Sequence, residues 1–279
     1  MRRLLVVLVL LSATFAYGHG RDFTINGDDC TRSHHRFHGR SGFVSEEVIE
    51  AGNLRSLSVN TSNSPLKISG GNSGGYTITV CKAAELAEDL AKIRVSVEGG
   101  ELRATGPDDG EWAVSYHVQA PNGADLRIDA SNGPVSIRDI DATIVARLRN
   151  GPLSLHDASG NIDVVTANGP ISIDGGSGTM KVQATNGPLS VKLENTWNGT
   201  LDASTKNGPL NVKVARDFSS GVVVESRGRG PISCRAAGCE RANRYWDDDE
   251  DEPRVIELGR GPANVRLSTV NGPVTIREE

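Results

Sequence analysis

The chain has 279 residues, of which 32 are Gly, 12 are Pro and 4% are aromatic. Gly and Pro together make about 16%, below the roughly 25–30% of low-complexity chains, and no G-X-Y period is present, so collagen-like and simple disordered chains are excluded. The formal net charge of −5 lacks the basic excess of a nucleic-acid-binding domain, and we expect no nucleic-acid partner.

Residues 1–18 have the pattern of a signal peptide. Met1-Arg2-Arg3 precede an apolar run from Leu4 to Leu11, and Ala16 and Gly18 fit a small-residue cleavage site. The run is shorter than the ~20 residues of a transmembrane helix. A retained anchor helix is the alternative. The sequence therefore predicts an exported chain, periplasmic, secreted or associated with the cell envelope, and without a transmembrane segment after cleavage.

Residues 19–42 are polar and rich in His, Gly and Arg, which predicts a flexible segment. An even number of cysteines in an exported chain permits disulfides. Proximity favours pairing the first with the second and the third with the fourth of Cys30, Cys81, Cys234 and Cys239. Metal binding is the alternative for Cys30, because it precedes His34, His35 and His38, but the spacing matches no zinc template. We predict no metal site and no cofactor.

Residues 43–121 read as an irregular, β-rich capping lobe, since repeat arrays need atypical ends. Alternating apolar residues predict strands at Phe43–Glu50, Leu54–Asn60, Leu66–Ser69, Tyr76–Cys81, Ile93–Glu98, Glu101–Thr105 and Trp112–Gln119. Lys82–Ala91 places its apolar residues on one face, which predicts a short helix. Asn63-Ser64-Pro65 is a degraded copy of a repeat that follows.

An internal repeat fills residues 122–279. Asn-Gly-Pro recurs at Asn132, Asn150, Asn168, Asn186, Asn207 and Asn271, and the first four are 18 residues apart. An apolar–polar–apolar triplet such as Ile171-Ser172-Ile173 follows each one, and a second alternating run precedes it. Each unit of ~18 residues thus carries two short strands. We predict an all-β fold, a parallel β-solenoid (β-helix) with right-handed coils.

The turn chemistry agrees with stacked coils. Gly adopts positive φ freely, Asn tolerates it, and Pro fits the start of a strand. Hairpins are the alternative, because Asn-Gly is a strong hairpin signal. One turn in every 18 residues favours an advancing coil instead. Coils stacked ~4.8 Å apart would bring the six Asn into one column, where we expect a ladder of side-chain hydrogen bonds.

The repeat is interrupted between residues 235 and 253. Insertions in repeat proteins map to loops that often bind ligands, so the candidate binding residues are Tyr245, Trp246, Asp247, Asp248 and Asp249. A hard cation would suit these carboxylates, but the spaced ligands of a calcium loop are missing. A solvated loop and a partner contact are the other interpretations. Cys234 falls in the inward column, either simply buried or in a disulfide that pins the loop.

We find no catalytic motif and predict no catalytic residue. Gly71–Gly75 matches G-x-S-x-G, but a strand follows it where a nucleophile elbow needs a helix. A polysaccharide-active β-helix would need two facing carboxylates. The outward column that follows each triplet is mostly basic: Arg138, His156, Asp174, Lys192, Lys213, Arg235 and Arg277. It would attract an anionic glycan or serve as a solubilising sheet edge.

The signal peptide, the Val-Gln-Ala-Pro-Asn-Gly-Ala segment at Val118–Ala124 and the Asn-Gly-Pro coils resemble the bacterial "putative adhesin" family, a domain of unknown function. The resemblance covers roughly residues 50–279 and implies an envelope-associated β-solenoid without catalytic residues to carry over. Regular Pro after Asn-Gly and the acidic insertion depart from that family.

Three functions remain open. The first is a non-enzymatic binding, adhesion-like or scaffolding module of the cell envelope, with an envelope protein or a glycan as partner. The second is a polysaccharide-active enzyme, which needs a cleft with two or three acidic residues. The third is a sensory or regulatory domain for envelope stress, with the acidic insertion as its contact to a partner.

Overall fold

The computed structural model describes residues 30, 36–37, 40–52, 54–71, 74–194, 197–216, 218–228, 230–236, 239 and 253–279. Over these ranges the chain is nearly all strand, with the short helix α1 (Ala87–Leu90), so the predicted all-β class is confirmed. No helix in the described part is long and apolar enough to cross a membrane. The predicted signal peptide, residues 1–18, lies outside these ranges.

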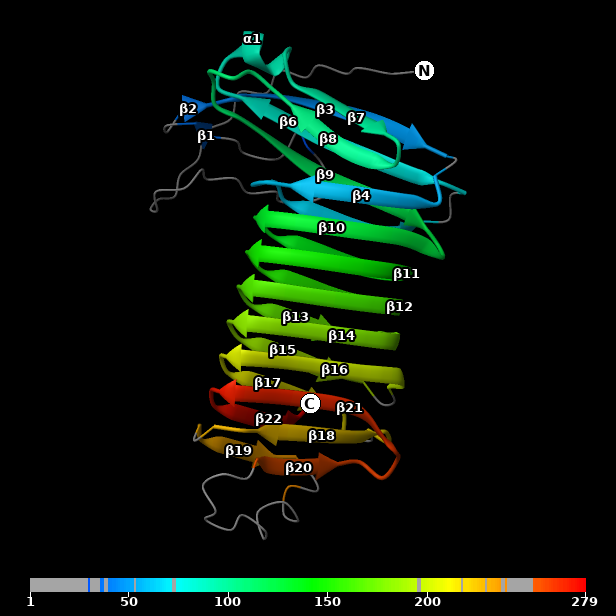
Figure 1. Ribbon diagram of the computed structural model, residues 1–279, viewed down its shortest axis with the longest axis vertical. Helices are drawn as coiled ribbons and strands as arrows, with labels where there is room; N and C mark the ends of the chain where they lie inside the picture. Colours follow the sequence, from blue (N-terminus) through cyan, green and yellow to red (C-terminus); the bar gives the residue numbers. More distant parts are fainter. Residues whose placement is uncertain are drawn as a thin grey trace.

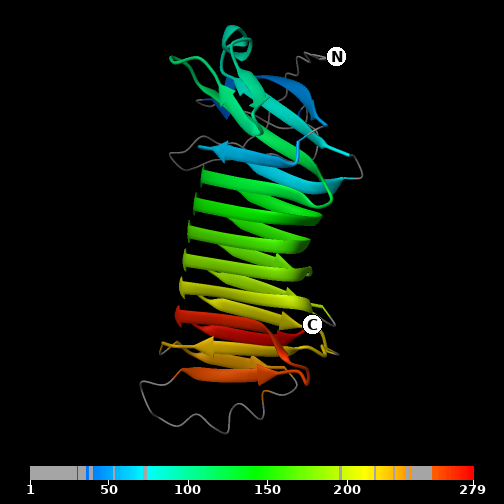
Figure 2. The ribbon, with the colours of Figure 1, turned by 45° about the vertical axis from the view of Figure 1, so that its right-hand side comes forward.

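A stack of parallel strands makes up the middle of the molecule (Figures 1 and 2). β10 pairs with β11 and β11 with β12, so that Ala124 lies opposite Ala142 and Val135 opposite Leu153, each 18 positions further along the chain. The strands of the stack are β10 (Ala124–Asn132), β11 (Val135–Asn150), β12 (Leu153–Asn168), β13 (Ile171–Asp174), β14 (Ser177–Asn186), β15 (Leu189–Leu193), β16 (Asn198–Asn207) and β17 (Leu210–Val214).

Alternate side chains of these strands point into one buried core. Equivalent positions stack on each other, as the register of Ile162 on Met180 and of Met180 on Leu201 shows, and all three are 1% exposed. A one-residue slip would turn every apolar side chain outward, so burial fixes the register. The same core continues without a break into residues 57–120 of the lobe.

The C-terminal coil does not follow its neighbour in sequence. Consecutive stacking would place β18 (Gly221–Ser226) beside β16, but β21 (Ala263–Asn271) pairs with β16 and β22 (Val274–Glu278) pairs with β17. β18 then pairs in parallel with β21, and β19 (Ile232–Arg235) with β22. The end of the chain is therefore inserted between two coils, as the red strands in Figure 1 show.

The sheet is mixed, with antiparallel pairs at both ends of the stack. At one end β20 (Arg254–Leu258) runs antiparallel to β18. At the other, β3 (Phe43–Ala51) pairs antiparallel with β6 (Tyr76–Ala84), and β6 pairs antiparallel with β9 (Trp112–Pro121). β7 (Arg94–Glu98) and β8 (Glu101–Thr105) form a further antiparallel pair.

The first rung of the stack lies before residue 122. β4 (Ser56–Thr61) pairs in parallel with β10, and β5 (Leu66–Gly71) pairs in parallel with β11. Between them lies Asn63-Ser64-Pro65, which the sequence marks as a degraded copy of the repeat. The first coil is therefore contributed by the lobe, and β9 covers it by pairing with β5.

The predicted helix at Lys82–Ala91 is mostly wrong. Its first three residues continue β6, and only Ala87–Leu90 are helical. The strand extends because β6 has a partner on each side over these residues, β3 and β9. Lys82 also donates to the Glu47 carboxylate at 2.8 Å in a buried ion pair that the helical pattern could not reveal.

The expectation of a flexible segment over residues 19–42 does not hold where that segment is described. Cys30 and Phe37 are buried, and Cys30 is joined to Cys81. A short antiparallel pair, β1 (Arg36–Phe37) and β2 (Arg40–Ser41), follows. These contacts attach the segment to the lobe at two points.

Candidate functional site

The Asn of the repeated turns form one column, and Asn63 adds a member at its N-terminal end. Every side-chain amide donates from Nδ2 to the Oδ1 of the Asn before it, over 2.8 Å for the first pair and 2.9 Å for the others. In order the column is Asn63, Asn132, Asn150, Asn168, Asn186, Asn207 and Asn271. The expected ladder is present, and all of its donors point towards Asn63.

Glycine is required beside each ladder Asn, as Gly169 illustrates. Its φ of 137° is a conformation that side chains rarely adopt, and an added Cβ would lie 2.1 Å from the carbonyl oxygen of Gly151. Its N–H donates to the Asn186 carbonyl at 2.9 Å. The turns are thus stacked backbone on backbone, and this geometry specifies the fold rather than a ligand.

The mixed-charge column lies in register, with His156 between Arg138 and Asp174, and Lys192 next to Asp174. Asp174 is 3.7 Å from His156 Nδ1 and 3.6 Å from Lys192 Nζ. These exposed ion pairs contribute little stability. The column neutralises part of its own charge, which weakens it as a site for an anionic glycan.

Asp139, His156 and Asp157 form the group of side chains nearest to a cation site in the described part of the chain. One ligand atom of each lies within 4.8 Å of the others. All three are exposed, and Arg138 Nε is 3.5 Å from Asp139 Oδ2. The alternative metal group fares differently: Cys30 is in a disulfide, and His34, His35 and His38 lie outside the described residues.

The acidic insertion lies outside the described residues, and with it Tyr245, Trp246, Asp247, Asp248 and Asp249. Gly71–Gly75 is only partly described, because positions 72 and 73 are outside too. The cysteines pair as proximity in the sequence favours, Cys30 with Cys81 and Cys234 with Cys239. Cys234 is half-buried against the core.

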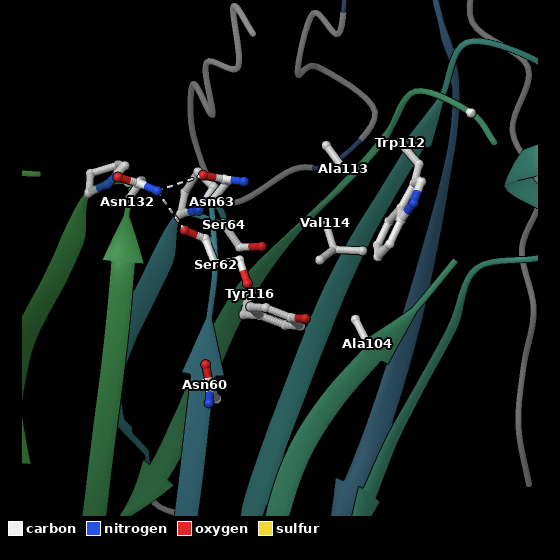
Figure 3. A pocket seen from close by; sticks show the side chains of 14 residues that line it. Asn60, Ser62, Asn63, Ser64, Ala104, Trp112, Ala113, Val114, Tyr116 and Asn132 are labelled. Atoms are coloured by element: carbon white, nitrogen blue, oxygen red, sulfur yellow. Dashed lines mark hydrogen bonds between the residues drawn. The ribbon is translucent and has the colours of Figure 1, made fainter. Parts of the chain in front are cut away.

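A pocket of about 810 Å³ lies where the lobe meets the first coils (Figure 3). One wall is the turn after β4, with Ser62, Asn63 and Ser64, and the Asn132 turn beside it. The opposite wall is the start of β9, from Trp112 to Tyr116, with Ala104 of β8. The volume is in the range of pockets that hold small ligands.

Two aromatic side chains define the β9 wall. The Trp112 indole donates from Nε1 to the Pro107 carbonyl at 3.2 Å and lies against Gly106, where a Cβ would come within 2.4 Å of the ring. This holds the ring in place across the pocket from Asn63 (Figure 3). Burial raises the pKa of Tyr116, so its hydroxyl keeps its proton, and with it its capacity to donate, at neutral and mildly alkaline pH.

The chemistry of the lining is uniform. Its fourteen residues include no Asp, Glu, His, Lys, Arg or Cys, and their polar side chains are amides and hydroxyls. Such a surface binds through hydrogen bonds and apolar contact and offers no general acid, general base or metal ligand. The geometry supports binding of an uncharged group.

Sequence reasoning missed this pocket. It placed Trp112–Gln119 in a strand and assigned no role to its aromatic residues. The available signal was the degraded turn at Asn63-Ser64-Pro65 together with the two aromatics of that strand, in a chain where aromatics make 4%. What brings them together is the parallel pairing of β5 with β9, which puts Leu66 opposite Tyr116 and cannot be read from either segment alone.

Comparisons with known proteins give one clear family. A model described as "Toastrack DUF4097" matches residues 40–277. No curated protein matches the chain.

Among solved structures, a "putative cell adhesion protein" from Clostridium sporogenes is 14% identical, with 85% of this chain and 100% of that one covered and a TM-score of 0.33. A "putative adhesin" from Bacteroides fragilis is 10% identical, with 85% and 97% covered and a TM-score of 0.34. A "putative lipid binding protein" from Parabacteroides distasonis is 10% identical, with 83% and 97% covered and a TM-score of 0.35.

Proposed function

Because the chain belongs to the Toastrack DUF4097 family, matched over residues 40–277, we propose that it is a non-enzymatic binding module built on a parallel β-solenoid. Coils of ~18 residues that stack in register are supported by the pairing of Ala124 with Ala142 and of Asn132 with Asn150. The right-handed connection that parallel strands prefer supports right-handed coils. On this proposal residues 43–121 cap the stack, 122–279 form it, and 235–253 are an insertion.

The pocket between lobe and coils is the observation that carries the proposal. Its walls come from three separate segments, around Asn63, Trp112 and Asn132. Each is fixed by neighbouring backbone: Tyr116 N donates to Pro65 O at 3.1 Å, and Leu66 N to Pro134 O at 3.0 Å. A preformed pocket with amides and aromatics suits binding, since little ordering is needed when a ligand enters.

Catalysis is disfavoured by the same lining. Hydrolysis of a glycosidic bond needs two carboxylic acids around the substrate, and this lining carries none. The group formed by Asp139, His156 and Asp157 is exposed and lies on a different edge of the stack, after the triplets.

Export to the cell envelope is part of the proposal. Residues 1–18 have the signal-peptide pattern. Two disulfides, Cys30–Cys81 and Cys234–Cys239, suit an oxidising compartment. The partner would then be an envelope component, a glycan or a protein. The insertion, with Tyr245, Trp246 and Asp247–Asp249, stays a second candidate contact.

A panel of polysaccharides and oligosaccharides tests this function when binding and new reducing ends are both measured. We expect binding without chain cleavage, weakened by Tyr116→Phe. Appearance of reducing ends that depends on the folded protein would contradict the non-enzymatic assignment.

A further inference from the structure

The Asn ladder has a direction, and its donor end lies in the pocket. Asn132 donates from Nδ2 to Asn63 Oδ1 at 2.8 Å and also to the Ser62 carbonyl at 3.2 Å. Asn150 and Asn168 repeat the same donation further down. Chains of aligned hydrogen bonds polarise one another, so the terminal donor is strengthened by those behind it.

Asn63 is that terminal donor. Its Oδ1 accepts from Asn132, its side chain is exposed, and its own Nδ2 donates to no described residue. Figure 3 shows this nitrogen on the side of Asn63 that faces away from Asn132, towards the β9 wall. Two N–H bonds are therefore available to a ligand at the rim of the pocket.

The opposite wall supplies the complementary surfaces. The Trp112 ring stands across the pocket from Asn63, and the Tyr116 ring lies below it (Figure 3). Val114 and Ala104 add apolar area between them. A ligand that fills the space must present an acceptor oxygen to Asn63 and an apolar C–H face to the aromatic wall.

We propose that the pocket binds an uncharged sugar unit of a glycan, with Asn63 as the donor that recognises a ring or hydroxyl oxygen. The inference rests on the proposed binding function and specifies its ligand. Sugars combine several hydroxyl groups with an apolar C–H face, which matches the amides, the hydroxyls and the aromatic rings of the two walls. An acidic sugar or a phosphate would find no Lys, Arg or His in the lining, and an acyl chain would bury the Asn63 amide without an acceptor.

Isothermal titration with defined probes tests the ligand class. The neutral probes are maltoheptaose, cellohexaose and chitohexaose; the charged probe is a galacturonic acid tetramer, and the acyl probe is palmitate. We expect at least one neutral probe to bind and the other two classes to bind at least tenfold more weakly. Asn63→Ala should weaken the neutral probe about 5–10-fold, the loss expected for about one hydrogen bond. Tyr116→Phe should weaken it about threefold or more.

Asn207→Ala is the matched control. It removes the same type of ladder contact, with Asn186 and Asn271, but lies outside the pocket lining. It should leave the dissociation constant within twofold, while both Asn variants keep a cooperative thermal transition. Equal weakening by the two variants would show that Asn63 acts through the stability of the ladder and would overturn its role as donor.

The remaining outcomes separate the ligand class from the function. If palmitate or the acidic tetramer binds and the neutral probes do not, and Tyr116→Phe weakens that binding, the sugar assignment fails and the binding function stands. If no probe binds, or if binding is insensitive to both Asn63→Ala and Tyr116→Phe, the pocket is not the binding site, and the proposed function fails with the sugar assignment.

Discussion

The regular coils and the N-terminal lobe share one core but achieve stability in different ways. In the coils every rung repeats the rung before it, so Asn lies on Asn and buried aliphatic side chains on aliphatic side chains. In the lobe the strands change direction, and non-repeating contacts appear: the Cys30–Cys81 disulfide and the buried pair of Lys82 with Glu47.

The difference explains where the pocket forms. A repeated coil leaves no room for a concave surface, because each rung is covered by an equivalent rung ~4.8 Å away. The lobe cannot continue that pattern, so β9 departs from the stack and carries Trp112 at its far end away from the Asn63 turn. The seam between the regular and irregular regions is therefore the place for ligand recognition.

Deletion of residues 259–279 should have the largest effect on the coils. It removes β21 and β22 from between their neighbours and with them Val265, Leu267, Val274 and Ile276, each at most 1% exposed. At roughly 1.5–3 kcal/mol per buried side chain, the loss is comparable to the whole stability of a domain. We expect no cooperative unfolding transition for the C-terminal coils in circular dichroism. A cooperative melt within a few degrees of the full chain would contradict the inserted position of these strands.

Removal of the disulfides should separate lobe from coils. Cys30 and Cys81 are 51 residues apart, whereas Cys234 and Cys239 are 5 apart. Loop-closure entropy predicts a loss of about 4 kcal/mol for the paired Ser variant of the first and about 2 kcal/mol for the second. Urea unfolding of the two double variants measures this. A larger loss at the C-terminal pair would reverse the view that the lobe depends more on its covalent link.

A pair of glycine substitutions compares the two regions directly. Gly169→Ala places a Cβ 2.1 Å from the Gly151 carbonyl at a φ of 137°, whereas at Gly74, in the lobe, an added Cβ meets nothing within 4 Å. We expect a loss of about 3 kcal/mol or more at Gly169 and less than about 0.5 kcal/mol at Gly74. Chemical denaturation of both variants gives the difference, and equal losses would show that the turns do not need their tight stacking.

Asn168→Ala should have the smallest effect of the four. It removes one donated and one accepted side-chain hydrogen bond, both 2.9 Å long and exposed. With roughly 0.5–1.5 kcal/mol for each bond, the loss should be about 1–3 kcal/mol. A drop of several degrees in the thermal midpoint checks it. An unchanged midpoint would mean that the ladder follows from backbone stacking without stabilising it.

The predictability of the fold follows the same division. Asn132 to Asn207 could be aligned from spacing alone, because each rung repeats its neighbour's chemistry. The insertion of β21 beside β16 could not, since Val265 suits any aliphatic neighbour and sequence order favours β18. The helix at Lys82–Ala91 failed because its apolar pattern is local, whereas the strand pairs at Lys82 with Ser45 and Val114 are not.

The candidate site was predictable only in part. Asn132 was singled out for its turn, and Asn63 was recognised as part of a degraded repeat. Trp112 and Tyr116 reach them through β9, which pairs with β5 some 50 residues earlier in the chain. Attention to Tyr245 and Trp246 followed from their position in an insertion, and they stay a prediction.

Hydrogen–deuterium exchange with the tightest-binding oligosaccharide tests the central claim, that the seam between lobe and coils is the binding site. We predict slower exchange in residues 60–66, 113–117 and 132–135, with the strands β14 to β17 unchanged. Protection along the outer faces of β14 to β17, or confined to residues 240–252, with no change at the seam, would contradict the account.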